Sequence, residues 1–221
     1  MSYQYLMFDL DGTITDSGHA IMSSVSYALD HMGITDQPED KLRRFVGPSL
    51  MDSFRGIYGM NDEDASEAVR LYRSIYEGER MYEVTLYPGI VDVLRTNIER
   101  GQKNILVTSK PHVFAEKILE RLGLSDLFIY QTGPEFDDHS SEKVRLINKA
   151  MKDLGLDPDA CIMTGDTHFD IDGAVLAGID SIGVTYGYGT RAELELAQAN
   201  YIVDRAEDLL PILGWRYPGS P

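Results

Sequence analysis

Short apolar runs alternate with amphipathic stretches through most of this chain. Each run has the length of a buried strand, and the predicted strands are residues 5–8, 104–108, 127–131, 161–164, 180–184 and 201–203. The stretches between them carry apolar residues at helical spacing, and the predicted helices are residues 90–100, 112–122, 141–154, 169–177 and 191–199. This alternation is typical of βαβ units, so it predicts an α/β fold with a doubly wound parallel sheet.

The pattern changes between the first and second predicted strands, where a long block shows helical periodicity and no strand signal. A first helix ends at Gly33, and the further helical pieces are residues 41–45, 49–58 and 63–80. An insertion at this position lies over the carboxyl ends of the strands. It can therefore act as a lid that excludes water and selects substrate.

Two linkers, at about residues 13–18 and 82–89, divide the chain. We expect an α/β core of residues 1–15 and 87–221, and an inserted α-helical cap of residues 16–86. The tail from residue 216 to 221 is expected to fray.

Composition narrows the classes of partner. The chain has 221 residues, of which 43% are hydrophobic, enough for a core with a smaller companion domain. Its 20 Lys and Arg residues against 36 Asp and Glu residues give a formal net charge of −16. Because nucleic acids and anionic membranes attract basic surfaces, this excess of acid argues against both partners.

Cysteine content and the start of the chain indicate a compartment. Cys161 is the single cysteine, so no disulfide forms within one chain, as expected in a reducing cytoplasm. Residues 1–4 lack the features of a secretory signal, and no apolar run approaches the roughly 20 residues that span a bilayer. We expect a cytoplasmic protein, and the sequence leaves monomer and homodimer open.

Two carboxylates follow the first predicted strand. Asp9 and Asp11 stand two residues apart, and open α/β sheets bind ligands at the carboxyl ends of their strands. One acid can attack phosphorus as a nucleophile while also holding a metal, and the other can transfer a proton. Gly12 permits a tight turn, and Thr13 offers a hydroxyl and backbone N–H groups to an anion.

Three further elements supply polar groups in order along the chain. Residues 107–111 follow the second strand, Lys143 opens a later helix, and residues 163–170 close another strand. Together with residues 8–13, they resemble the four motifs of the haloacid dehalogenase superfamily of aspartate-nucleophile phosphatases. The similarity extends over roughly residues 3–204, and the subgroup that the chain resembles most is the phosphoglycolate-phosphatase-like hydrolases with a small helical cap.

This resemblance implies a Rossmann-like core of the haloacid dehalogenase type and a Mg²⁺-dependent phosphatase. Asp9 is expected to be the nucleophile and a metal ligand. Asp11 is expected to be the acid/base, and by resemblance it also offers its backbone carbonyl to the metal. Asp166 should bind the metal, and Asp170, four residues on, should hold the metal or its waters. Carboxylates without cysteine or paired histidine favour a hard ion such as Mg²⁺.

Other residues are expected to bind the phosphoryl group. Thr108 would donate its hydroxyl to a phosphate oxygen, and Ser109 and Lys110 follow at a helix start that can bind an anion. Many relatives have Asn where Ser109 stands, which leaves the contact of Ser109 open. Lys143 would neutralise the phosphate, because it begins its helix facing the strand ends, unlike Arg145 or Lys149.

The cap must select the substrate. Arg44, Phe45 and Gly47, with Arg43 beside them, are the candidates, since a cation and a ring near the Gly47-Pro48 break suit an anion-selecting loop. An exposed basic patch on a helix is an equally weighted alternative.

The expected reaction is hydrolysis of a small phosphate monoester through an aspartyl-phosphate, with a small phosphorylated metabolite as partner. Phosphoglycolate, a sugar phosphate, a nucleotide and pyrophosphate all stay open. The alternatives are a phosphoglucomutase-like phosphoryl transfer and a phospho-accepting regulatory module, which also uses an Asp cluster, Mg²⁺, Thr and Lys. The helical insertion and the spacing of Asp9 and Asp11 argue against the regulatory module.

Overall fold

The computed structural model describes residues 3–136 and 142–214. Its main strands are β1 (Tyr5–Phe8), β4 (Lys103–Val107), β5 (Tyr130–Thr132), β6 (Cys161–Gly165), β7 (Asp180–Val184) and β8 (Tyr201–Val203). They form a six-stranded sheet in the order β5-β4-β1-β6-β7-β8, with every neighbouring pair parallel. The chain winds outward from β1 in both directions, which confirms the predicted doubly wound parallel sheet.

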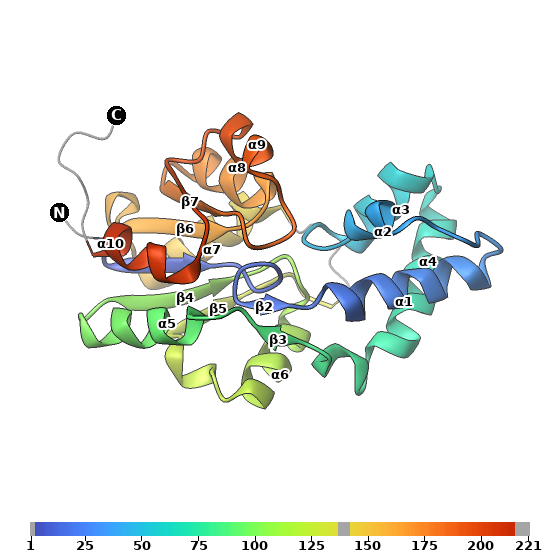
Figure 1. Ribbon diagram of the computed structural model, residues 1–221, viewed down its shortest axis with the longest axis horizontal. Helices are drawn as coiled ribbons and strands as arrows, with labels where there is room; N and C mark the ends of the chain where they lie inside the picture. The colour runs from blue at the N-terminus through green and yellow to red at the C-terminus, as the bar shows by residue number, and fades with distance from the viewer. Residues whose placement is uncertain (1–2, 137–141, 215–221) are drawn as a thin grey trace.

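Helices cover both faces of this sheet. They are α5 (Ile90–Glu99), α6 (His112–Leu122), α7 (Lys143–Leu154), α8 (His168–Ala177), α9 (Arg191–Leu196) and α10 (Leu209–Leu213). Alternate residues of β1 face opposite ways, so Leu6 and Phe8 pack with α5, α6 and α10, whereas Met7 packs with α7 and α8. Figure 1 shows α5 below the sheet and α8 above it.

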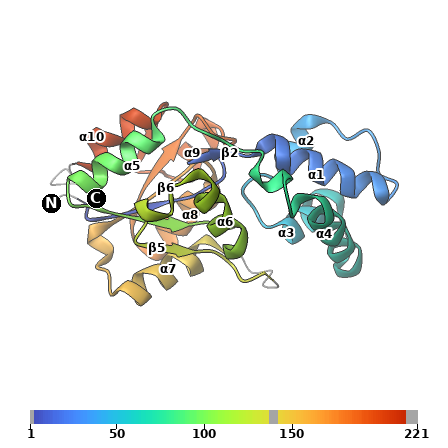
Figure 2. The same ribbon diagram turned by 90° about the horizontal axis from the view of Figure 1, so that it is seen from below.

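A helical cap is inserted between β1 and α5. It contains α1 (Gly18–His31), α2 (Glu39–Arg43), α3 (Leu50–Tyr58), α4 (Asp62–Tyr76) and a 3₁₀ turn, Arg80–Tyr82. The cap buries an apolar core of its own, which includes Leu29, Phe54 and Tyr76. Figures 1 and 2 both show these helices beside one end of the sheet. This is the end at which the polar residues that follow the strands are gathered.

The two chain crossings between core and cap form a small ribbon that the sequence analysis described only as linkers. Strands β2 (Thr15–Asp16) and β3 (Thr85–Leu86) pair antiparallel. Two residues are too short for a strand periodicity to be read. The pairing exists because the fold brings Thr15 beside Leu86 and Asp16 beside Thr85, residues that are far apart in the chain.

Three predicted bounds are wrong. The strand expected at residues 127–131 begins only at Tyr130, because Ser125–Leu127 form a 3₁₀ turn and Phe128 is buried against the core cluster. The helix expected to reach residue 80 ends at Tyr76, since Gly78 has a φ of 122°. The helix expected to reach residue 199 ends at Leu196, ahead of Gln198 with its left-handed φ of 66°.

Two further expectations, a helix start at residue 141 and a frayed tail from 216 to 221, lie outside the described residues. Within residues 3–136 and 142–214, no helix is both long enough and apolar enough to cross a membrane.

Candidate active site

Asp9 and Asp11 lie directly after β1 in a tightly bonded turn. The Leu10 N–H donates to Asp9 Oδ1 at 2.7 Å, and the Gly12 N–H donates to the Thr15 carbonyl at 2.8 Å. Gly12 has a φ of 81°, and a Cβ added there would lie 2.1 Å from Asp166 Oδ2. Gly12 is therefore required both by the turn and by the close approach of Asp166.

Three carboxylates meet at the carboxyl edge of the sheet. Asp9, Asp166 and Asp170 each offer a ligand oxygen, and these oxygens lie within 4.8 Å of one another. All three side chains are buried, and Asp166 Oδ1 has no hydrogen-bond partner among the described residues. Buried carboxylates repel one another unless a cation compensates them, so the cluster fits a hard divalent metal.

Lys143 supplies part of that compensation from the first turn of α7. Its Nζ lies 2.8 Å from Asp170 Oδ1 and 3.1 Å from Asp9 Oδ1, and it donates to the Val107 carbonyl at 3.1 Å. Burial alone would lower the pKa of Lys143, but Asp170 and Asp9 raise it above the usual value. The ammonium group is therefore held charged beside Asp9.

The pKa of the Asp9 carboxyl group is higher than that of an ordinary surface acid. Burial raises the pKa of Asp9 to about 7, with Asp170 and Asp11 adding to the rise and Lys143 opposing it. Burial and Asp170 likewise raise the pKa of Asp166 well above its usual range, while the N–H of Tyr188, which donates to Asp166 Oδ2 at 2.7 Å, works against the rise. Further positive charge at the cluster would stabilise both carboxylates in the ionised form.

Hydroxyl groups flank the acids on the β4 side. Thr108 follows β4, is 1% exposed, and accepts the Lys110 N–H on its Oγ1 at 3.2 Å. Thr13 is fully buried, and its Oγ1 has no hydrogen-bond partner within the described parts of the chain. Since β4 pairs directly with β1, the structure brings Thr108 to the same sheet edge as Asp9. These positions suit the binding of phosphate oxygens.

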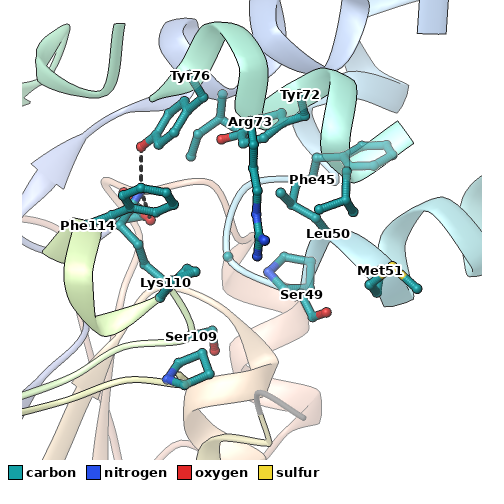
Figure 3. A pocket seen from close by; sticks show the side chains of 17 residues that line it. Phe45, Ser49, Leu50, Met51, Tyr72, Arg73, Tyr76, Ser109, Lys110 and Phe114 are labelled. Atoms are coloured by element: carbon teal, nitrogen blue, oxygen red, sulfur yellow. Dashed lines mark hydrogen bonds and ion pairs between the residues drawn. The ribbon is translucent and has the colours of Figure 1, made fainter. Parts of the chain in front are cut away.

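A pocket that is partly open to solvent lies between this edge and the cap. The core contributes Asp11, Ser109 and Lys110, and the cap contributes mainly apolar and aromatic side chains. The cap residues that line it are Ile21, Phe45, Gly47, Pro48, Ser49, Leu50, Met51, Val69, Tyr72, Arg73 and Tyr76. Figure 3 shows Arg73 extending from α4 into the pocket, toward Ser49. The pocket can therefore hold the alcohol portion of a phosphate ester, next to the carboxylates of the sheet edge.

The expected cap residues are only partly brought together. Phe45 and Gly47 line the pocket, and Phe45 is 1% exposed because it also belongs to the core of the cap. Arg44 is exposed and lines a second, larger groove beside α8 instead. Arg43 lies with it there and donates to the Gly187 carbonyl at 3.3 Å. The structure does not place Arg44 in the pocket with Asp11.

Several residues at the site were not identified from the sequence. Ser17 donates its hydroxyl to Asp11 Oδ1 at 2.6 Å, and the Tyr188 hydroxyl accepts the backbone N–H groups of Ser17 and Gly18 at 2.9 and 2.6 Å. The sequence places Ser17 only within the linker of residues 13–18. Tyr188, Tyr76 and Arg73 are single side chains in a loop or on a helix, and no sequence spacing connects them to the strand ends.

Lys110 has a different environment from the one expected. Its Nζ lies 2.9 Å from Asp11 Oδ2 and donates to the hydroxyl of Tyr76, in the cap, at 2.7 Å. The side chain is 8% exposed. The ammonium group is therefore directed at the second aspartate and the cap, on the other side of Asp11 from the bond made by Ser17.

Comparison with known proteins assigns the class. The chain belongs to the haloacid dehalogenase-like hydrolase family, whose model matches residues 6–184. It superposes with a TM-score of 0.92 on the crystal structure of a predicted phosphatase from Clostridium acetobutylicum, at 39% identity and over 96% of this chain and 98% of that one. Within the family the chain is a phosphatase, a phosphoric monoester hydrolase.

Two relatives with nearly the same sequence identity to this chain carry different names. A 5′-nucleotidase of Pseudomonas aeruginosa is 36% identical over 207 residues, which cover 93% of this chain and 94% of that protein. The tyrosine-protein kinase PtkA of Mycobacterium tuberculosis is 35% identical over 188 residues, which cover 85% of this chain and 64% of that protein.

Proposed function

We propose that this phosphatase hydrolyses a small phosphate monoester through an aspartyl-phosphate on Asp9, with Mg²⁺ held by Asp9, Asp166 and Asp170 and by the backbone carbonyl of Asp11. The observation that carries the proposal is the joint placement of three buried carboxylates, Lys143 and the Asp11-lined pocket at one sheet edge. When bound there, Mg²⁺ supplies positive charge to the carboxylates and to the phosphoryl oxygens.

The first half-reaction transfers the phosphoryl group to the protein. An Asp9 carboxylate oxygen attacks phosphorus, and the bond between phosphorus and the ester oxygen breaks. Asp11 gives its proton to that oxygen, so the substrate leaves as an alcohol. Lys143, whose Nζ lies 3.1 Å from Asp9 Oδ1, would neutralise charge on the phosphoryl group, and the buried Thr13 and Thr108 would donate hydroxyl hydrogen bonds to its oxygens.

The second half-reaction restores the protein. Asp11, now a carboxylate, takes a proton from water as the water oxygen attacks phosphorus, and the bond from phosphorus to the Asp9 oxygen breaks. Inorganic phosphate leaves, and Asp9 and Asp11 return to their starting states.

The substrate class follows from the pocket between core and cap. Aromatic walls with a single arginine accept a compact organic group that carries a polar or anionic end. A sugar phosphate, a phosphoglycolate-like ester and a nucleotide fit this description, and the relative named 5′-nucleotidase supports testing nucleotides first. We also propose that the enzyme is cytoplasmic, since the buried thiol of Cys161 forms no disulfide. It is further proposed to act on a small molecule as a monomer or homodimer.

The test is steady-state phosphate release from a panel of nucleoside monophosphates, sugar phosphates, phosphoglycolate and pyrophosphate, with Mg²⁺ present. We expect multiple turnovers from the native protein and none from Asp9→Asn. Asp172→Asn is the matched control, because Asp172 is exposed on α8 only two residues from Asp170 and outside the cluster. Turnover that survives in Asp9→Asn would remove Asp9 as the nucleophile.

The same panel tests the alternatives. A mutase would move phosphate between positions of a sugar and release little of it, and a phospho-accepting module would incorporate phosphate once per chain. No contact in the described residues favours either alternative over hydrolysis.

A further inference from the structure

Two buried side chains connect the cap to the second aspartate. The Tyr76 hydroxyl on α4 accepts a hydrogen bond from Lys110 Nζ at 2.7 Å, and the same Nζ lies 2.9 Å from Asp11 Oδ2. Tyr76 is 1%, Asp11 6% and Lys110 8% exposed. Figure 3 draws the bond between Tyr76 and Lys110 as a dashed line at the side of the pocket. The contact therefore spans from the cap, through the loop after β4, to the loop after β1.

We propose that Lys110 and Tyr76 are positioning residues that orient the Asp11 carboxyl group for proton transfer to the leaving oxygen, and that the enzyme is thereby adapted to esters of aliphatic alcohols. This inference rests on the proposed function and adds two residues, one of them from the cap, to the proton-transfer step.

The geometry holds both oxygens of Asp11. Ser17 Oγ donates to Oδ1 at 2.6 Å, while Lys110 binds Oδ2 from the opposite end of the carboxylate. A carboxyl group bound at both oxygens has little rotational freedom, and its remaining lone-pair positions can carry the transferred proton, so the direction of proton transfer is fixed relative to the pocket that Asp11 lines. If Lys110 were lost, Asp11 would keep only one of these two side-chain bonds.

Lys110 itself needs an anchor, and Tyr76 provides it. A lysine ammonium on four rotatable bonds is not positioned by one partner alone. The Tyr76 ring stacks on Tyr72 with centroids 4.9 Å apart and meets the Phe114 ring edge-on at 5.9 Å, so its hydroxyl is held by packing from the cap and from α6. The bond exists only when α4 lies against the loop after β4, so the approach of the cap completes the orientation of Asp11.

The leaving group distinguishes this role from a general structural one. An aliphatic alkoxide is a strong base and needs a proton as it leaves, whereas p-nitrophenolate is a weak base and leaves without one. Loss of the orienting contacts should therefore slow hydrolysis of an alkyl phosphate and spare an aryl phosphate. Weakened packing or weakened phosphate binding would slow both esters alike.

The experiment measures kcat/KM with glycerol phosphate and with p-nitrophenyl phosphate, because this ratio covers the steps up to departure of the leaving group and excludes the later attack of water. Tyr76→Phe removes one oxygen atom and should lower kcat/KM for glycerol phosphate about tenfold, and Lys110→Met about a hundredfold. Both should change the value for p-nitrophenyl phosphate by less than about threefold. The loss should appear in kcat rather than in KM.

The matched control is Tyr58→Phe, which also removes a tyrosine hydroxyl from the cap. That hydroxyl donates to the Gln37 side chain at 2.9 Å, away from Asp11 and Lys110. The control variant should leave both esters unchanged. Equal losses on the two esters, or no loss in Tyr76→Phe, would overturn the inference while leaving the proposed function in place. If the native protein releases no phosphate from these two esters or from any ester of the earlier panel, the proposed function fails and the inference falls with it. Should Lys110→Met fold poorly by circular dichroism, Tyr76→Phe alone decides the question.

Discussion

The two sides of the pocket differ in the kind of interaction that builds them. The core side is built from buried ionisable groups. Oxygens of Asp9, Asp166 and Asp170 lie within 4.8 Å of one another, and Lys143 Nζ lies 2.8 Å from Asp170 and 3.1 Å from Asp9. On the cap side, Tyr72, Tyr76 and Phe45 belong to an apolar core that also forms the wall of the pocket. Charge thus acts on the phosphoryl group, and shape acts on the rest of the substrate.

This difference has a consequence for specificity. The residues of the acidic edge must contact a phosphoryl group of one fixed geometry, so few substitutions there would preserve the chemistry. The cap wall is made of packed side chains, and apolar side chains of similar volume can replace one another at modest cost.

Removal of the metal should have the largest effect, because it withdraws the charge on which the core side depends. Chelation by EDTA should reduce phosphate release by a factor of about 10³–10⁵, and added Mg²⁺ should restore it. Asp166→Asn should raise the Mg²⁺ concentration required for half-maximal rate, whereas Asp172→Asn should not. Phosphate release that is indifferent to the chelator would contradict the metal assignment.

Replacement of the acid/base comes next. Asp11→Asn should lower turnover of an alkyl phosphate by a factor of about 10²–10⁴, the range for a lost proton-transfer group. Asparagine keeps an oxygen to accept the Ser17 hydroxyl but loses the charge that pairs with buried Lys110 at 2.9 Å, so the fold of the variant must be verified beside its rate. Steady-state kinetics and circular dichroism on the same preparation check both points. A normal rate would show that Asp11 does not transfer the proton.

The buried lysine should contribute to stability as well as to chemistry. Lys143→Met leaves Asp9 and Asp170 without their ion-pair partner, so the free energy of unfolding should fall by about 3–5 kcal/mol. Lys149→Met on the same helix removes an exposed pair with Asp153 and should cost about 1 kcal/mol or less. Urea unfolding in chelator compares the two, and equal values would mean that the Lys143 contacts are not stabilising.

The smallest effect is expected on the cap side. Arg73→Ala should raise KM about tenfold with little change in kcat, since Arg73 lines the pocket but lies on the cap and outside the carboxylate cluster. Arg70→Ala is the control, because Arg70 lies one turn earlier on α4 and pairs with Glu67 at the surface. An effect of Arg73→Ala confined to kcat would assign it to the chemistry instead of to substrate binding.

Much of the core side could be predicted because its residues follow strands. Asp9, Thr108 and Asp166 each come directly after a short apolar run, and parallel strands end at the same edge, so their proximity follows from local pattern and topology together. Lys143 was expected from its place at a helix start, and its contacts with Asp9 and Asp170 agree with that placement.

The cap side could not be predicted in the same way. Arg44 and Phe45 are adjacent in sequence, yet Phe45 lines the pocket and Arg44 the second groove, because successive side chains at the end of a helix point in different directions. Tyr76 lies 34 residues before Lys110, and no periodicity connects a helix of the cap with a loop of the core. The pairing of β2 with β3 was missed for the same reason.

The sequence by itself determined the fold class, the family and the order of the acids along the chain, because these depend on strand periodicity and on short motifs. The tertiary structure decided which side chains face one another across the pocket: Tyr76 with Lys110, Lys110 with Asp11, and Arg73 with Phe136. These contacts join segments of the cap and the core that are far apart in the chain. They depend on how two separately packed cores meet, which no local pattern encodes.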